Sequence, residues 1–295
     1  MRNLSGIFPP ITTPFAENGD LLIDSFSENL SKWASSRLAG VTVLGSNGES
    51  PYLSDDEKLL LVREVRQHLG PDKTLIAGAG RESTRLCIDF IGKIANLGVD
   101  YALVGTPCYF KPRMGDEELF AHYSRIADAS PIPILIYNVP QFTGINTSAG
   151  LIAKLARHEN IAGIKESSAN LALQADIRRQ TNDRFQILVG SAPTLLPSLI
   201  QGACGGVVAI ACALPELIVD LYEAFYRGDW KHAATLQERI SPPAAAVTTL
   251  FGVPGLKAAL DLMGYFGGWP RLPLLPLDAA KRANLKSIFQ AASLL

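Results

Sequence analysis

Several features are missing from this sequence, and each absence excludes a class of protein. Lysine plus arginine (27) nearly balance aspartate plus glutamate (28), without long runs of like charge, so we expect no nucleic-acid or polybasic membrane surface. No apolar run reaches the ~18 residues of a membrane span. The four cysteines and four histidines are scattered, without a CxxC pair or ligand spacing. This pattern argues against disulfides and against a metal site.

The amino-terminal stretch MRNLSGIFPPITTPF also lacks the features of a targeting segment. It has neither the apolar core of a signal peptide nor the arginine- and serine-rich pattern of a transit peptide. We therefore expect a cytoplasmic enzyme or binding protein.

Short apolar runs rich in valine, isoleucine and leucine recur along the chain, as expected for strands covered on both faces. They span 7–15, 40–47, 74–80, 101–107, 132–140, 161–167, 185–191 and 205–211. Segments with helical spacing lie between them. Eight such units predict an α/β fold, a (β/α)8 TIM barrel, with a doubly wound sheet as the alternative.

Helix boundaries are also visible. Ser54 and Glu57 have the spacing of a capping box, and Gly70 marks the end of the same helix. A second helical segment ends at Gly98. From about residue 214 the pattern is helical throughout. We interpret residues 1–225 as the barrel with the active site, and 226–295 as a helical extension packed on it.

Polar residues follow five of the predicted strands. These segments are GSNGES (45–50), TPCYF (106–110), YNVPQFTG (137–144), KESS (165–168) and GSAPT (190–194). In a barrel the carboxyl ends of all strands meet at one rim, where active sites are built. The sequence therefore predicts that these five segments form a single pocket.

Lys165 is the most informative residue of this set. A lysine at a strand end is often only solvated, but here it would open into an apolar barrel mouth. Removal from water favours the neutral amine, which is a nucleophile toward ketones. Tyr137, at the end of the preceding strand, could transfer protons, or could simply cap a buried strand. Tyr109 has the same two interpretations.

The GSNGES loop offers backbone N–H groups and the hydroxyl of Ser46, which can bind a carboxylate or phosphate. It lacks the spacing of a Walker loop or of a dinucleotide fingerprint. We therefore expect no nucleotide cofactor.

Together, the motifs GSNGE, TPCYF, YNVPQFTG and GIKESS resemble the dihydrodipicolinate synthase/N-acetylneuraminate lyase family. This resemblance covers the whole chain. It implies a (β/α)8 barrel with a C-terminal helical extension, commonly a homotetramer, although a homodimer is also possible. It also implies a class I aldolase or lyase that holds pyruvate, or another 2-oxo acid, as a lysine Schiff base without metal or nucleotide.

The resemblance assigns a catalytic role to four residues. Lys165 matches the Schiff-base lysine and Tyr137 matches the tyrosine that transfers protons to the substrate. Ser46 matches the hydroxyl residue of the proton relay. Tyr109 matches the tyrosine that, in tetramers, reaches into the neighbouring subunit's site.

The same resemblance assigns substrate-binding positions. Ser46 and Asn47 match residues that bind the substrate carboxylate. Gly190 and Val208 match residues that line the pocket beside the lysine.

Within the family, the chain most resembles the 4-hydroxy-2-oxoglutarate aldolases, which form pyruvate and glyoxylate. The similarity lies in GSNGE, TPCYF, residues 130–134 and residues 245–268, and it places Ser167 beside the glyoxylate carboxylate. Dihydrodipicolinate synthases have an arginine where this chain has Phe142. Dihydrodipicolinate synthesis therefore stays open as an alternative, with Arg113 as the nearest replacement cation.

Two further alternatives remain at this point. One is a 2-oxo-3-deoxy sugar acid aldolase. The other is a barrel that binds a 2-oxo acid without turnover.

Overall fold

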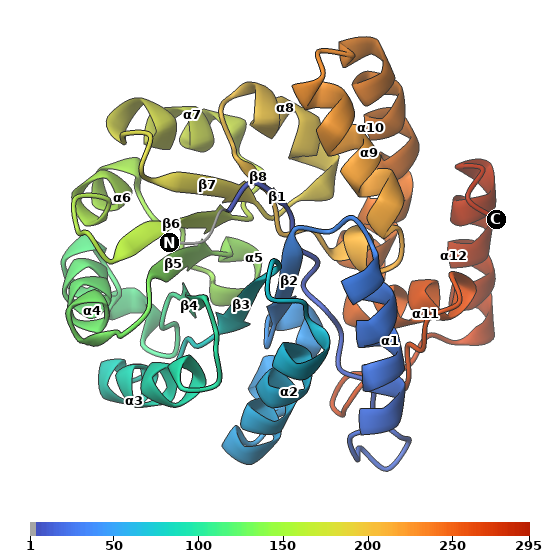
Figure 1. The fold of residues 1–295 in the computed structure, drawn as a ribbon, viewed down its shortest axis with the longest axis horizontal. Helices are drawn as coiled ribbons and strands as arrows, with labels where there is room; N and C mark the ends of the chain where they lie inside the picture. Colours follow the sequence, from blue (N-terminus) through green and yellow to red (C-terminus); the bar gives the residue numbers. More distant parts are fainter. Residues whose placement is uncertain (1–3) are drawn as a thin grey trace.

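Each of the eight predicted apolar runs contains or overlaps a strand, and these strands form one parallel barrel (Figure 1). The computed structural model describes residues 4–295. The strands are β1 Gly6–Ile7, β2 Gly40–Val43, β3 Thr74–Gly78, β4 Tyr101–Gly105, β5 Ile134–Asn138, β6 Ile161–Glu166, β7 Gln186–Val189 and β8 Gly205–Gly206. Their order is β1-β8-β7-β6-β5-β4-β3-β2. The predicted TIM barrel is thereby confirmed.

The first strand is much shorter than its apolar run, because two prolines follow it. Pro9 and Pro10 have no N–H group to donate to a neighbouring strand. The chain still closes the barrel at this point. The Pro9 carbonyl accepts a hydrogen bond from the Thr42 N–H (2.9 Å), and the Ile11 N–H donates to the Thr42 carbonyl (2.9 Å). Irregular backbone thus joins β1 to β2.

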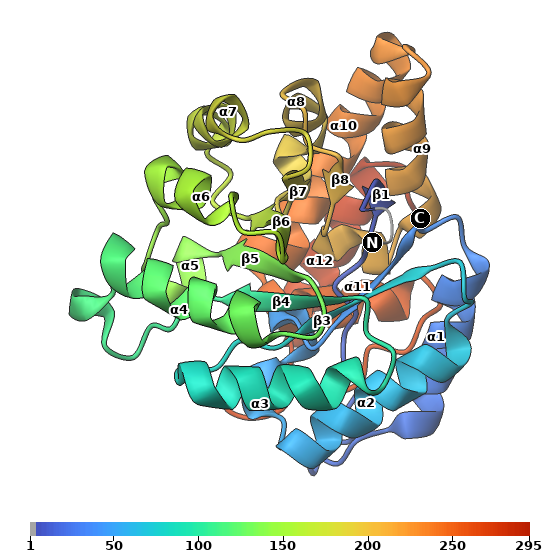
Figure 2. The ribbon, with the colours of Figure 1, turned by 60° about the vertical axis from the view of Figure 1, so that its left-hand side comes forward.

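Helices cover the outside of the barrel (Figure 2). They are α1 Ile23–Ser35, α2 Asp55–His68, α3 Thr84–Ala95, α4 Asp116–Ala129, α5 Pro140–Thr143, α6 Ala149–Leu155, α7 Leu171–Gln180, α8 Leu195–Ile200 and α9 Pro215–Tyr226. Short 3-10 turns occur at η1 Ser46–Gly48, η2 Ser50–Tyr52, η3 Lys111–Arg113, η4 Ala192–Thr194 and η5 Ala209–Cys212.

The sequence signals for α2 and α3 are confirmed. Ser54 and Glu57 form a reciprocal capping box, with hydrogen bonds of 3.2 and 2.8 Å. The α2 helix ends just before Gly70, and α3 ends before Gly98, whose φ of 80° is left-handed.

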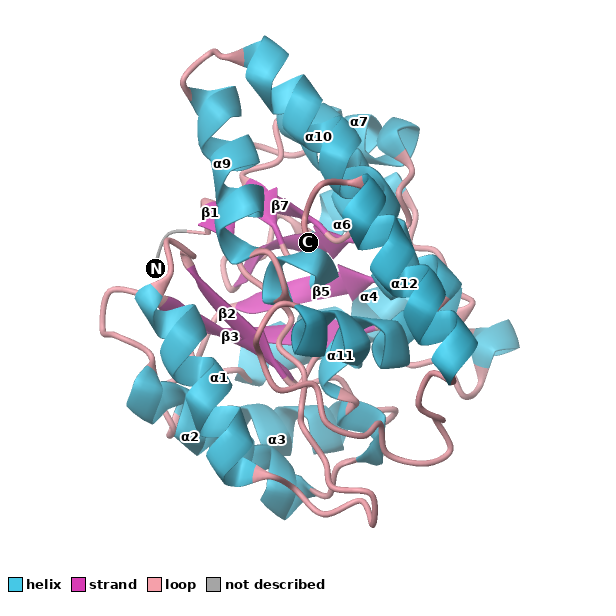
Figure 3. Ribbon diagram, turned by 90° about the vertical axis from the view of Figure 1, so that its right-hand side faces the viewer, coloured by secondary structure: helices cyan, strands magenta, loops and turns pink. Residues whose placement is uncertain are grey.

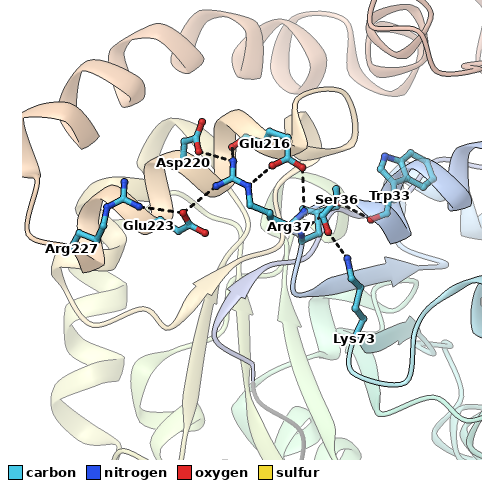
Figure 4. A network of polar contacts seen from close by, with 9 residues as sticks. Trp33, Ser36, Arg37, Lys73, Glu216, Asp220, Glu223 and Arg227 are labelled. Atoms are coloured by element: carbon cyan, nitrogen blue, oxygen red, sulfur yellow. Dashed lines mark hydrogen bonds and ion pairs between the residues drawn. The ribbon is translucent and has the colours of Figure 1, made fainter.

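A polar network joins the connection between α1 and β2 to the last barrel helix (Figure 4). The guanidinium of Arg37 forms ion pairs with Glu216 (2.6 Å), Asp220 (2.7 Å) and Glu223 (3.1 Å), all on α9. These side chains are about half exposed, so each pair contributes at most about 1 kcal/mol. The cluster fixes α9 against the segment that closes the barrel.

Three helices follow α9 and pack together on one side of the molecule (Figure 3). They are α10 Trp230–Ala245, α11 Gly252–Leu262 and α12 Ala279–Ala291, with a π-helical turn at Ala246–Leu250. The α11 helix contacts α12 and also η5, the turn that follows β8. The end of α9 coincides with the boundary proposed at residues 225 and 226, and the division into two units stays a proposal.

Within residues 4–295, no helix combines the length and apolar character needed to cross a membrane. All four cysteines have free thiols.

Candidate active site

Lys165 and Tyr137 lie side by side at the carboxyl end of the barrel. They occupy paired positions on the parallel strands β6 and β5. Both are buried, with 4% and 9% of their surface exposed. The Lys165 Nζ atom lies 4.2 Å from the centre of the Tyr137 ring. The strand register therefore brings the predicted nucleophile and the predicted proton-transfer group together.

Ser46 approaches the same pair from β2. It begins the 3-10 turn Ser46–Gly48, three residues after the last residue of β2. Its Oγ atom lies 3.4 Å from the Tyr137 Oη, and either hydroxyl can donate the hydrogen bond. The structure thus brings Ser46, Tyr137 and Lys165 together, and the proton relay that the resemblance implies for them stays a prediction.

The loop that carries Ser46 and Asn47 is strained. Leu44 and Glu49, on either side of it, have left-handed φ values of 58° and 55°. Such conformations cost about 1–3 kcal/mol each in a residue other than glycine, and they persist only where the surroundings hold them. One restraint is visible: the Thr13 hydroxyl donates to the Gly48 carbonyl at 2.8 Å.

Ser167 and Gly190 meet closely beside the lysine. A Cβ atom on Gly190 would lie 1.7 Å from the Ser167 Oγ, so only glycine fits at this position. The Ser167 Oγ is buried and has no hydrogen-bond partner among residues 4–295. Since an unpaired buried hydroxyl is costly, it is available to a polar group of a bound substrate.

Val208 is fully buried and immediately precedes η5. Within η5, burial raises the pKa of the Cys212 thiol well above its usual range, while the nearby Lys165 opposes that shift. The segment that follows β8 is therefore buried and apolar, and the pocket-lining role expected for Val208 stays a prediction.

Among the four predicted catalytic residues, Tyr109 lies apart from the other three within the single chain. Its side chain is 80% exposed and packs edge-on against Phe110. Within the described residues, no hydrogen bond or ring contact joins it to Ser46, Tyr137 or Lys165. Its backbone N–H, like that of Cys108, donates to the Glu82 carboxylate at 2.9 Å, which fixes the loop.

The model of the dihydrodipicolinate synthetase family matches residues 3–292. The chain belongs to this family.

Named relatives of this chain span nearly its whole length. A 4-hydroxy-tetrahydrodipicolinate synthase of Methanosphaerula palustris is 36% identical over 289 residues, covering 96% of this chain and 97% of the relative. One of Exiguobacterium sp. is 34% identical over 287 residues, covering 97% of each chain. The crystal structure of dihydrodipicolinate synthase from Cyanidioschyzon merolae with lysine bound has a TM-score of 0.94, at 31% identity and 100% coverage of both chains.

These similarities confirm the family expected from the sequence, and with it the class: the chain is an aldolase-type lyase. They do not show the narrower likeness to 4-hydroxy-2-oxoglutarate aldolases. The relatives instead carry the name of the reaction kept as an alternative.

The position where dihydrodipicolinate synthases were expected to carry an arginine holds Phe142 on α5. Its ring is 66% exposed. Arg113, the replacement cation considered from the sequence, lies exposed on η3. A different cation, Lys111, lies against the end of the α5 turn: its Nζ is 2.5 Å from where a Cβ on Gly144 would be.

Sequence reasoning missed two residues that hold the rim together. The Asn138 amide donates to Glu166 Oε2 and to Asn146 Oδ1, both at 2.8 Å. Glu166 also accepts from the Ser168 N–H (2.6 Å), and Asn138 Oδ1 accepts from the Thr147 N–H (3.1 Å). Polar residues directly after Tyr137 and Lys165 were the signal, because neighbours on a strand point to opposite faces.

Proposed function

We propose that this enzyme forms a Schiff base between Lys165 and pyruvate and uses it to make or break a carbon–carbon bond. The observation that carries the proposal is the arrangement of buried Lys165 and Tyr137 at two paired strand ends, with half-buried Ser46 within hydrogen-bond distance of the Tyr137 hydroxyl. A buried amine beside a hydroxyl relay is the arrangement that imine formation requires.

In the proposed reaction, the Lys165 amine attacks the ketone carbon of pyruvate, and the carbonyl oxygen leaves as water. The resulting iminium withdraws electrons from the adjacent methyl carbon, which loses a proton to give an enamine. The enamine carbon then attacks an aldehyde, and hydrolysis of the imine releases the product and the amine.

Tyr137 and Ser46 would carry the protons that these steps release and consume. Backbone N–H groups of the η1 turn and the Asn47 side chain would bind the pyruvate carboxylate. The iminium itself serves as the electron sink, so the proposed reaction uses neither metal nor nucleotide.

For the second substrate, we infer aspartate semialdehyde as the first candidate, which would make the enzyme a 4-hydroxy-tetrahydrodipicolinate synthase. The support is the printed name of relatives that are 34–36% identical across nearly the whole chain.

Cleavage of 4-hydroxy-2-oxoglutarate is the second candidate. It is favoured by Phe142, because an exposed ring cannot pair with a carboxylate as an arginine does. The small polar set of Ser46, Asn47 and Ser167 is also the one expected for that reaction. Cleavage of a 2-oxo-3-deoxy sugar acid is the third candidate reaction, and its rate is measured in the same comparison of substrates.

The deciding experiment has two steps. Borohydride reduction with pyruvate, followed by peptide mass spectrometry, is expected to place a stable adduct on Lys165. Lys165→Met is the matched control, because it keeps the side-chain volume and has no amine. An adduct elsewhere, or none on folded protein, would refute the proposal.

The second step compares initial rates on the candidate substrates under one set of conditions. Condensation of pyruvate with aspartate semialdehyde at a rate well above cleavage of 4-hydroxy-2-oxoglutarate supports the first candidate. The opposite ratio supports the second.

We also propose that the active assembly is a homotetramer or homodimer in which Tyr109 completes a neighbour's site. The exposed Tyr109–Phe110 pair supports this, since two large aromatic rings lie in water in the single chain. Sedimentation with parallel assays tests it, and a fully active monomer would contradict it.

A further inference from the structure

A buried ion pair links the proposed substrate-binding loop to the C-terminal helices. The Glu49 Oε1 atom lies 2.6 Å from the Lys257 Nζ, and the two side chains are 0% and 2% exposed. Glu49 ends the loop that begins with Ser46 and Asn47, whereas Lys257 lies in α11. The two charged residues lie far apart in the sequence, and the fold brings them into contact.

The second carboxylate oxygen of Glu49 is also held from the C-terminal part of the chain. Its Oε2 accepts a hydrogen bond from the backbone N–H of Arg271 at 2.8 Å. The guanidinium of Arg271 in turn donates to both oxygens of Glu57, at 2.7 and 2.9 Å. The Lys257 amine donates additionally to the Trp269 carbonyl at 2.5 Å. Two separate segments beyond the barrel therefore fix one carboxylate.

Phe15 completes the site from the amino-terminal segment. Lys257 Nζ lies 4.6 Å and Arg271 Cζ 4.2 Å from the centre of its ring, within the range of cation–π contacts. The Phe15 carbonyl also accepts a hydrogen bond from the Trp269 N–H at 2.9 Å. The two residues that hold the Glu49 carboxylate, Lys257 and Arg271, thus also contact a residue of the amino-terminal segment.

Stability alone does not explain this pair. Desolvation of two charges costs several kcal/mol, which their attraction often fails to exceed, so apolar residues of similar volume would serve as well or better. Burial lowers the pKa of Lys257 to about 8 even though Glu49 raises it, so desolvation is the larger effect. A buried pair with little net gain in stability can still fix the relative position of the segments that it joins.

The segment next to this ion pair is the strained loop that carries Ser46 and Asn47. Glu49 is itself one of the two non-glycine residues with left-handed φ that flank the loop, and its side chain is anchored on both oxygens. Release of that anchor would let the backbone relax toward an ordinary φ and rotate the preceding turn. Ser46 lies in that turn, so its Oγ atom would move relative to the Tyr137 Oη. The hydrogen bond between them, which is 3.4 Å long, would then be lost.

We propose that Lys257 and Glu49 are positioning residues, through which the C-terminal helices hold the Ser46–Asn47 loop in its pyruvate-binding form. Neither residue touches the substrate. The inference rests on the proposed function, because it assigns the loop to the substrate carboxylate.

The test uses a variant that removes both charges, Glu49→Gln with Lys257→Met, so that no unpaired charge stays buried. The readout is the pyruvate concentration that gives half-maximal borohydride trapping on Lys165. We expect it to rise about tenfold, which corresponds to about 1.4 kcal/mol of binding free energy. Trapping at saturating pyruvate should still reach Lys165.

Arg239→Met is the matched control. Arg239 holds the end of α12 to α10 through the carbonyls of Ala292 and Ser293, away from the loop. It should destabilise the C-terminal helices without changing the half-maximal pyruvate concentration. A folded double variant within twofold of the unsubstituted protein would overturn the inference. If the unsubstituted protein gives no adduct, the proposed function fails instead.

A second measurement needs no substitution. Coupling between two sites is reciprocal, so pyruvate trapped on Lys165 should slow amide hydrogen exchange in α11 as well as in residues 45–49. Protection of the loop with unchanged exchange in α11 would overturn the inference, even if the double variant does not fold.

Discussion

The side-chain nitrogen of Lys165 lies 4.2 Å from the centre of the Tyr137 ring, and the two residues are paired in register on β6 and β5. Hydrogen bonds between two rigid strands, rather than a flexible loop, fix their relative position. A proton-transfer group placed this way needs little reorganisation when the imine forms.

Tyr137→Phe is expected to lower kcat by about 100- to 10,000-fold, the usual contribution of a positioned acid–base group. The ring stays and only the hydroxyl is lost, so the strand pairing should be unchanged. Steady-state rates with pyruvate and the active aldehyde measure the effect. Ser46→Ala should lower kcat by a smaller factor, because water can replace the serine hydroxyl. Ser46→Thr should retain most of the activity. A Tyr137→Phe variant with normal kcat would remove the hydroxyl from the mechanism.

Gly190→Ala is expected to destabilise the protein by about 1–3 kcal/mol, because the new methyl group would overlap the Ser167 Oγ. It should also raise the pyruvate KM, since Ser167 must move at the pocket. Thermal unfolding and rate measurements test both effects. Adding Ser167→Ala should recover part of the loss. Additive effects of the two substitutions would show that these residues do not interact.

Acid should destabilise the fold through His122. Burial lowers its pKa from 6.5 to about 4, with Glu82 opposing the shift, and its Nδ1 lies 2.8 Å from the Thr84 hydroxyl. Between these two values the unfolded chain binds a proton that the folded chain does not. The contribution of neutral His122 is therefore complete above pH 6.5 and is lost as the pH falls toward 4, by up to about 3 kcal/mol.

Denaturant unfolding of wild type and His122→Gln across this pH range measures that contribution. The variant should lose less stability on acidification. Parallel pH dependence in the two proteins would assign the acid sensitivity to other groups.

Phe142→Arg is expected to lower the KM for aspartate semialdehyde if that aldehyde is the second substrate. A guanidinium at the α5 turn would pair with its carboxylate. The half-maximal pyruvate concentration for trapping on Lys165 should not change, because Phe142 is not part of the imine site. Phe142→Leu is the control for loss of the ring alone. An equal effect of both substitutions would show that the charge is not what matters.

The barrel and the pairing of Lys165 with Tyr137 could be predicted from the sequence, because both follow from local patterns. Each strand is an apolar run of valine, isoleucine and leucine, and each functional segment follows one directly. The same rule extends to Asn138 and Glu166, whose alternation along the strand marks them as facing the other way.

Other features depend on contacts that no local pattern contains. Glu49 and Lys257 lie far apart in the chain, and each looks like an ordinary charged residue of a loop or a helix. The shortness of β1 depends on the prolines that follow it, which the apolar run alone conceals. The predicted role of Tyr109 needs a second copy of the chain.

The ion pair between Glu49 and Lys257 also bears on how the protein is made. A chain on the ribosome contains the whole Ser46–Asn47 loop and all eight strands before residue 257 has been added. Glu49 then lacks both Lys257 and Arg271, the two residues that hold its carboxylate in the finished fold. If the ion pair holds the loop as proposed, this part of the rim reaches the arrangement of the complete chain only after the C-terminal helices have been added.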